Sequence, residues 1–238
     1  MKPRQQGFTL IELAIVLVVL TVLAAGLLMP LSATIQIKRN EATQVTLEQA
    51  RDALIGYAMA HTAVDPLTGN VRHYLPCPAD STGQELPRAN LACPSQQGTF
   101  PWVTLGVGGS DAWGNRLYYA VDTNYSQPFS STSTTNDNLQ VCTAAGCPAG
   151  TLSANNLAAL VTSRGQNGWG AISANSTYAN AHTAPTSADE LENTNKDSNF
   201  VMRPATQASA TTTEFDDLVV WLPVSTLLAR VCPAGGCP

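Results

Sequence analysis

The sequence predicts an α+β protein in which one long N-terminal helix packs against a head with a small antiparallel sheet. The first observation is an apolar segment at 8–29, directly followed by a segment with helical spacing of apolar residues at 30–61. The second is the remainder, 62–238, where short strand-like runs alternate with turns. The third is a set of six cysteines, all within 62–238, which predicts loops stapled by disulfides.

The segment 8–29 has the length and composition of a membrane span. As a helix it would be roughly 33 Å long, which is enough to cross the apolar core of a bilayer. The leader at 1–7 carries Lys2 and Arg4 and no acid, so we expect it on the cytoplasmic side and the head on the opposite side.

One charged residue, Glu12, lies inside this apolar segment. A carboxylate in an apolar helix is costly, and such a residue normally has a function and a partner. The competing interpretation is an uncleaved signal anchor in which Glu12 reaches the membrane surface or is protonated.

The string GFTLIE at 7–12, after a short basic leader, resembles the class III leader of type IV prepilins and type II secretion pseudopilins. This resemblance implies that a membrane-bound prepilin peptidase cuts between Gly7 and Phe8 and methylates the new N-terminus. Glu12 would then pair with the terminal ammonium of Phe8 in a neighbouring subunit, where water is excluded and charge pairing is strong.

The segment 30–61 is expected to continue the helix. Pro30 lacks an amide hydrogen, so we expect a kink or local melting at that residue, after which the helix resumes. Pilins resemble this layout, with a long helix whose second half is covered by the head. The residues predicted to form its buried stripe are Val45, Leu47, Ala50, Leu54, Tyr57, Ala58 and His61.

Six cysteines on the exported side allow fifteen disulfide pairings. We favour the local set of Cys142 with Cys147 and Cys232 with Cys237, because each pair encloses four residues that include glycine. Cys77 would then pair with Cys93. Zinc is the alternative ligand for these cysteines, but the scattered histidines and the oxidising compartment argue against it.

In the head we expect an irregular, stapled region at 65–97 and a half-buried strand within 112–122. The low-complexity segment 122–138 is expected to be an exposed, mobile loop. Further strands are expected at 157–163 and 218–222, followed by a helical turn near Leu227. The stretch SDAWGNRLYYAV at 110–121 resembles a structural motif of major pseudopilins, with Ala112 in place of a proline.

The turn SRGQNG at 163–168 resembles the calcium-binding turn of major pseudopilins, with Asn167 in place of an aspartate. The resemblance implies calcium ligands among Ser163, Asn167, Asp189 and Glu190, whereas the residues alone favour a glycine-rich turn followed by a solvated acidic helix start. We interpret Asp216 and Asp217 as an exposed strand entry, because neighbours in a strand point to opposite faces.

Composition excludes other functional classes. The net charge of −5 disfavours a general nucleic-acid partner, and we find no phosphate-binding, serine-hydrolase or zinc-protease motif, so no enzymatic activity is predicted. Charged residues make up only 12% of the chain, which suits an extracytoplasmic surface.

The resemblance implies a type IV pilin-like or pseudopilin subunit. It would wait in the inner membrane with its head in the periplasm and then join a periplasmic pseudopilus or a surface pilus. The implied partners are other such subunits, the prepilin peptidase and methyltransferase, and an inner-membrane assembly platform. The alternatives are a minor pilin that acts as an adhesin or DNA-uptake module, and an uncleaved anchored periplasmic protein.

Overall fold

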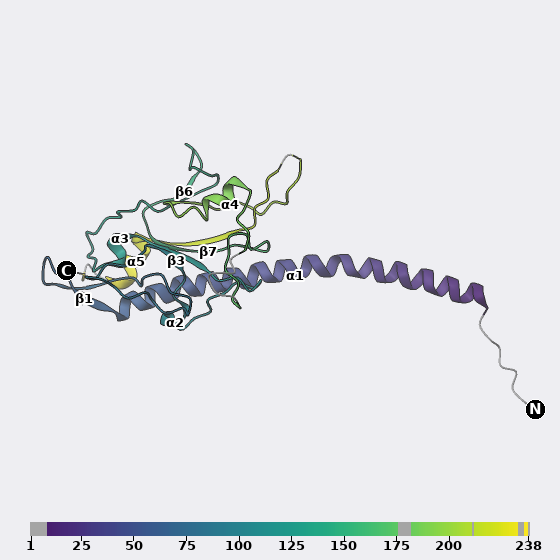
Figure 1. Ribbon diagram of the computed structural model, residues 1–238, viewed down its shortest axis with the longest axis horizontal. Coiled ribbons are helices and arrows are strands. Elements are labelled where there is room, and N and C mark those ends of the chain that lie inside the picture. Colours follow the sequence, from purple (N-terminus) through teal and green to yellow (C-terminus); the bar gives the residue numbers. More distant parts are fainter. Residues whose placement is uncertain (1–8, 176–181, 211, 233–235, 238) are drawn as a thin grey trace, which may run out of the picture. The chain divides into compact units, whose positions relative to one another are not determined.

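The computed structural model describes residues 9–175, 182–210, 212–232 and 236–237, with the side chains of 24–32 left out. By internal contacts it divides into two compact units, Met1–Glu41 and Ala42–Pro238. Figure 1 shows the helices and strands, with labels where there is room. In chain order they are α1 (Leu10–Ala60), β1 (Thr62–Val64), β2 (Val71–His73), β3 (Gln97–Thr99), α2 (Trp102–Leu105), β4 (Tyr118–Val121), α3 (Thr123–Ser126), β5 (Gln140–Cys142), β6 (Leu152–Ala154), β7 (Leu157–Ser163), α4 (Ala188–Glu192), β8 (Asn199–Val201), β9 (Leu218–Pro223) and α5 (Val224–Val231).

Helix α1 runs through Pro30 without interruption, so the predicted local melting is not seen, and the predicted kink stays a prediction. Its first turn is closed by a capping box between Thr9 and Glu12. Thr9 donates to Glu12 Oε2 from its backbone N (2.9 Å) and its Oγ1 (2.8 Å). Among the described residues no helix qualifies as a candidate membrane span. Phe8 and the side chains of 24–29 lie outside them, so the span at 8–29 stays a prediction.

Within the second unit, residues 42–60 of α1 bury the predicted stripe only in part. Leu47, Ala50 and Leu54 are fully buried, as expected for a helix face with apolar residues at three- and four-residue steps. Val45 is 52% exposed, and His61 is exposed beyond the end of the helix, where its ring stacks on Tyr57. Those two assignments to the buried stripe were therefore wrong.

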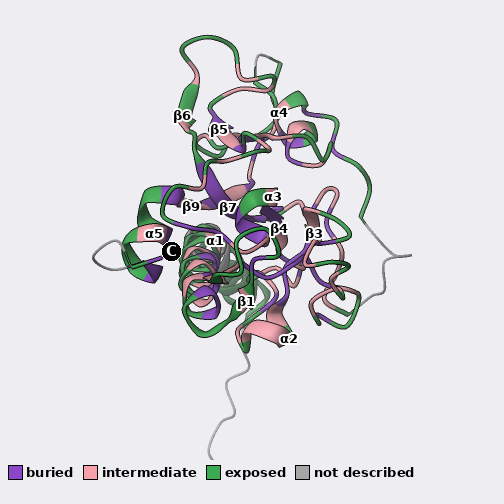
Figure 2. Ribbon diagram, turned by 90° about the vertical axis from the view of Figure 1, so that its left-hand side faces the viewer, coloured by how far each residue is buried: buried purple, intermediate pink, exposed green. Residues whose placement is uncertain are grey.

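The main sheet has the strand order β3-β4-β7-β9 and is antiparallel throughout. Strand β7 has the predicted bounds, 157–163, and every one of its residues is buried, as expected for a central strand. Figure 2 shows buried segments along β4, β7 and β9. The core combines side chains of α1, β4, β7, β9 and α5, with Phe100, Tyr125 and Phe129 as large fully buried members.

A second sheet has the order β6-β5-β8, and a hairpin pairs β1 with β2. Strands β5 and β8 are parallel, so the head is not purely antiparallel as predicted. The α+β class is confirmed. So are the three local disulfides, Cys77–Cys93, Cys142–Cys147 and Cys232–Cys237.

The segment 122–138 was wrongly predicted to be an exposed, mobile loop. It contains α3, and Tyr125 and Phe129 are fully buried in the core. Asp122 is also buried, and its carboxylate accepts hydrogen bonds from the backbone N–H groups of Asn124 (3.0 Å), Asn136 (2.8 Å) and Asp137 (2.8 Å). One carboxylate therefore ties together both ends of a segment whose composition alone indicated disorder.

Candidate functional site

Three carboxylates meet in the second unit to form an acidic cluster, which we define as Glu190, Asp216 and Asp217. One oxygen from each lies within 4.8 Å of the others. Glu190 is 1% exposed and Asp217 is 5% exposed. Buried acids are rare without compensating partners, so this cluster is the strongest candidate site among the residues that the structure describes.

Three segments bring these side chains together. Glu190 belongs to α4, Asp216 and Asp217 immediately precede β9, and the turn after β7 contributes Asn167. Gly165 in that turn has a φ of +60°, and a Cβ there would lie 2.2 Å from the carbonyl oxygen of Asp216. A glycine is therefore required for the turn to approach the strand start this closely.

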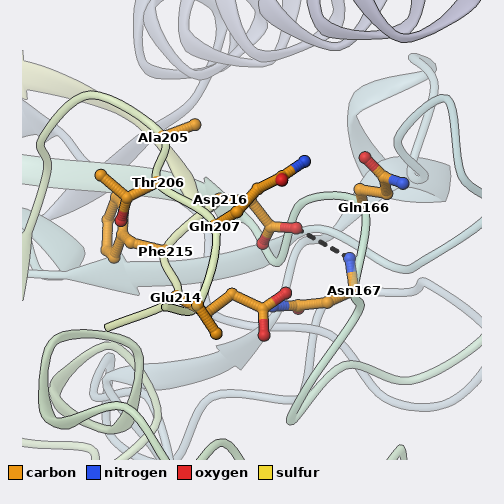
Figure 3. A pocket seen from close by; sticks show the side chains of 9 residues that line it. Gln166, Asn167, Ala205, Thr206, Gln207, Glu214, Phe215 and Asp216 are labelled. Atoms are coloured by element: carbon orange, nitrogen blue, oxygen red, sulfur yellow. Dashed lines mark hydrogen bonds between the residues drawn. The ribbon is translucent and has the colours of Figure 1, made fainter. Parts of the chain in front are cut away.

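Hydrogen bonds satisfy only part of the cluster. Glu190 Oε1 accepts from Asn167 Nδ2 (3.0 Å) and from the Asp216 backbone N (3.2 Å). Asp216 Oδ2 accepts from the Asn167 backbone N at 2.8 Å, the contact drawn in Figure 3. Glu190 Oε2 and Asp216 Oδ1 are buried and have no hydrogen-bond partner in the described part of the chain.

Asp217 differs from its two neighbours because a basic residue faces it. Arg164 Nη1 lies 3.5 Å from Asp217 Oδ2, and both side chains are at most 3% exposed. Asn193 Nδ2 donates to the same oxygen at 2.8 Å. One positive charge therefore opposes three carboxylates.

Burial raises the pKa of each of the three acids, and repulsion from neighbouring acids adds to this effect for Glu190 and Asp216. Burial, followed by the charge of Asp217, raises the pKa of Glu190 to about 7. The pKa of Asp216 also rises to about 7, mainly because of burial. The hydrogen bond from the Asn167 backbone opposes this rise, and repulsion from Asp217 and Glu190 adds to it. Burial raises the pKa of Asp217 as well, although Arg164 counteracts this effect.

A polar pocket of about 550 Å³ adjoins the cluster. Figure 3 shows Asn167 and Asp216 on its wall, together with Glu214 and Gln207. Counted over the described residues, the lining includes two acids and no basic residue. This composition fits a cation and disfavours a phosphate-rich ligand such as a nucleic acid.

The structure brings together two of the four residues expected as calcium ligands. Asn167 and Glu190 are in contact, but Ser163 instead donates its hydroxyl to Asp111 (2.7 Å). Asp189 forms an ion pair with Arg203 (2.7 Å). Asn167 faces Glu190 with its amide nitrogen, while its Oδ1 accepts from the Trp169 backbone N, so it presents no free oxygen to the cluster.

The interpretation of Asp216 and Asp217 as an exposed strand entry was wrong. Strand β9 begins at Leu218, so the alternation of a regular strand does not apply to the two acids. The glycine-rich turn and the acidic pair were each visible in the sequence, but their 49-residue separation concealed that Asn167 contacts Asp216.

The predicted processing and assembly residues lie in the first unit. Gly7 and Phe8 fall outside the described residues. Glu12 is exposed, and Thr9 is the partner that the structure gives its carboxylate. Its pairing with a neighbouring subunit stays a prediction.

Comparison with protein families gives a match at the N-terminal end of the chain. Residues 2–28 match the family model described as the prokaryotic N-terminal methylation motif. The match is consistent with the class III leader of a type IV pilin or pseudopilin precursor. No curated protein and no solved structure matched the chain.

Proposed function

We propose that this chain is a type IV pilin-like or pseudopilin subunit that is cleaved after Gly7, methylated on Phe8 and assembled into a filament. The observation that carries the proposal is the methylation motif at residues 2–28, which includes the proposed cleavage site and Glu12. The subunit has a structural role and is not an enzyme. Its partners are the prepilin peptidase and methyltransferase, the inner-membrane assembly platform and other subunits of the filament.

The α+β head supports this proposal because residues 42–60 of α1 are packed into it as part of its core. In the proposed pathway the head faces the periplasm while residues 8–29 hold the subunit in the inner membrane. Glu12 then pairs with the methylated ammonium of Phe8 in an adjacent subunit. A carboxylate and an ammonium attract strongly where the surroundings exclude water.

The test is intact-mass and N-terminal analysis of the protein from its native host, with and without the prepilin peptidase. We expect a mature chain that begins with N-methylated Phe8 and is lost in the peptidase mutant. An intact Met1, or cleavage at another position, would refute the proposal and favour an uncleaved membrane-anchored protein.

We further propose that the acidic cluster binds a calcium ion through Glu190, Asp216 and Asp217. The supporting observation is the pair of buried oxygens, Glu190 Oε2 and Asp216 Oδ1, that lack a hydrogen-bond partner in the described residues. Carboxylate oxygens are the ligands that calcium prefers. A bound ion would offset the repulsion among the three acids and stabilise the head.

This proposal is tested by thermal unfolding in chelator-treated buffer with added calcium or magnesium. We expect calcium at up to ~1 mM to raise the Tm, with a weaker effect of magnesium. Glu190→Gln should abolish the increase, whereas Glu48→Gln, at an exposed position on α1, should retain it. An unchanged Tm in the native protein would refute calcium binding and leave the filament proposal intact.

A further inference from the structure

The turn closed by the Cys142–Cys147 disulfide contacts the helix that carries Glu190. We call residues 142–147 the disulfide turn. Its Ala145 backbone N donates to Asp189 Oδ1 at 2.9 Å, and its Gly146 backbone N donates to Glu192 Oε1 at 2.8 Å. Both acceptors lie in α4, on either side of Glu190, so two adjacent amides of the turn hold the helix at two points.

Helix α4 depends on such external contacts because it has only five residues. A helix this short is not stable by its own hydrogen bonds. Asp189 also forms an ion pair with Arg203, which is partly exposed. The position of α4, and with it the approach of Glu190 to Asp216, therefore relies in part on what holds the two flanking acids.

A second route connects the disulfide turn with the acidic cluster through β8. Cys142 pairs with Val201 across the parallel β5 and β8 strands. The Asn193 side chain accepts from the Val201 backbone N (2.7 Å) and donates to its carbonyl oxygen (3.0 Å). Asn193 Nδ2 also donates to Asp217 Oδ2 at 2.8 Å. The start of the turn is thereby connected to Asp217, and its tip to the neighbours of Glu190.

The backbone of the disulfide turn needs a constraint to keep this shape. Gly146 has a φ of +70°, and Cys147, which has a side chain, has a φ of +46°. The left-handed region is unfavourable for residues other than glycine. Without the covalent bond the turn can relax, and the N–H groups of Ala145 and Gly146 then lose their alignment with α4.

We propose that the Cys142–Cys147 disulfide is a redox-controlled clamp on the acidic cluster. When the bond is formed, the turn holds α4 so that Glu190 faces Asp216 and Asp217; when it is reduced, α4 is released and the cluster opens. Formation removes two electrons and two protons from the two thiols. The electrons reduce the disulfide of a thiol–disulfide oxidant to a dithiol, and an added dithiol reverses the step.

The clamp does not depend on which cation the cluster binds. For a head that is exported as proposed above, it makes the cluster a feature that matures after export, because disulfides form in oxidising compartments. With Cys142 and Cys147 reduced, the chain would still contain Glu190, Asp216 and Asp217, but α4 would not hold Glu190 against the two aspartates.

The test compares hydrogen exchange in two variants of the full-length chain. Cys142→Ser with Cys147→Ser removes the clamp. Cys232→Ser with Cys237→Ser is the matched control, because that disulfide has the same sequence separation of 5. We expect amides in 164–170, 188–193 and 214–218 to exchange about tenfold faster in the first variant only. Faster exchange confined to 142–152, or equal changes in both variants, would overturn the clamp.

A second pair of variants keeps the disulfide and removes its contacts with α4. Asp189→Ala with Glu192→Ala should reproduce the faster exchange at 164–170 and 214–218 with the disulfide intact. Arg203→Gln controls for the ion pair with Asp189. If Arg203→Gln opened the cluster as much as the double alanine variant, the ion pair and not the turn would position α4. Should the serine variant fail to fold, this comparison alone decides.

Discussion

The start of α1 and the acidic cluster each contain a glutamate that stands out, but for opposite reasons. Glu12 is exposed in this single chain and has local partners, since Thr9 closes a capping box with it. Glu190 is buried and has an oxygen without a partner in the described residues. The first carboxylate is satisfied in the single chain and is proposed to act between chains, whereas the second is unsatisfied within the fold itself.

The difference teaches where each kind of site can be recognised. An acid in an apolar run is visible from its neighbours along the chain, so the sequence alone identifies Glu12. A buried acidic cluster is visible only when the chain has been folded, because its members come from α4 and the start of β9. Substitutions at and around the two glutamates can test whether they have the separate roles that this comparison assigns to them.

The largest expected effect is on assembly. Glu12→Gln keeps the size of the side chain and removes its charge, so we expect at least about a tenfold loss of subunits from the filament fraction. Cleavage after Gly7 should continue. The measurement is immunoblotting of sheared filaments and of membranes from the native host. Glu48→Gln on the same helix is the matched control and should assemble normally; equal loss in both variants would contradict a specific role for Glu12.

The next largest effect is on stability within the cluster. Asp217→Asn leaves the Arg164 guanidinium buried without its counter-charge, and we expect it to lower the free energy of unfolding by about 3 kcal/mol. Asp52→Asn breaks the exposed pair with Arg51 and should change the free energy of unfolding by less than about 0.5 kcal/mol. Urea unfolding followed by tryptophan fluorescence measures both. Similar losses in the free energy of unfolding for the two variants would show that the pair of Arg164 with Asp217 stabilises the fold no more than an exposed ion pair does.

Patterns local in sequence predicted much of the fold. The all-apolar run of β7 identified the central strand with its bounds, and the glycine-containing C-x4-C spacings identified two disulfide turns. The wrong predictions share a physical cause, because each concerns contacts between residues that are distant in sequence. Asp122 accepts hydrogen bonds from Asn136 and Asp137, and this order cannot be deduced from a serine- and threonine-rich composition.

The candidate site shows the same limit at the level of single residues. The turn at 163–168 and the acids of α4 were singled out as candidate ligands, and of these Asn167 and Glu190 do meet. The sequence could not show that Asp189 forms an ion pair with Arg203 or that Ser163 donates its hydroxyl to Asp111, because both contacts join segments that are distant in sequence. It also could not show that Asp216 and Asp217, correctly placed before the strand, are drawn inward and converge on Glu190.

A smaller effect concerns pH. The pKa of Glu190 and that of Asp216 rise to about 7 in the folded chain, above the ordinary values of 4.5 and 3.8. The folded state therefore holds these protons more tightly, and the stability they contribute is present below about pH 4 and lost as the pH rises through about 7. In calcium-free buffer we expect the Tm to fall by about 5 °C between pH 5 and pH 8.

Glu190→Gln should reduce this pH dependence, because the glutamine is neutral at every pH and no longer repels Asp216, whose pKa stays raised by burial. Glu48→Gln should retain it. Added calcium should reduce the slope in the native protein if the ion binds the charged carboxylates. A Tm that is constant or rises from pH 5 to pH 8 in chelator-treated buffer would contradict the raised pKa values of Glu190 and Asp216.

The smallest effect separates the two possible uses of Glu12. Thr9→Ala removes the hydroxyl of the capping box but leaves the Glu12 charge, so we expect about threefold faster amide exchange at residues 10–13 in detergent micelles. Thr21→Ala is the matched control, because Thr21 donates its hydroxyl to Val18 within the same helix and lies far from its start. Thr9→Ala should still assemble, since pairing between subunits requires only the carboxylate. If Thr9→Ala abolished assembly as completely as Glu12→Gln, the capping box would be essential to assembly, and Glu12 would act through the helix start and not through a charge on its neighbour.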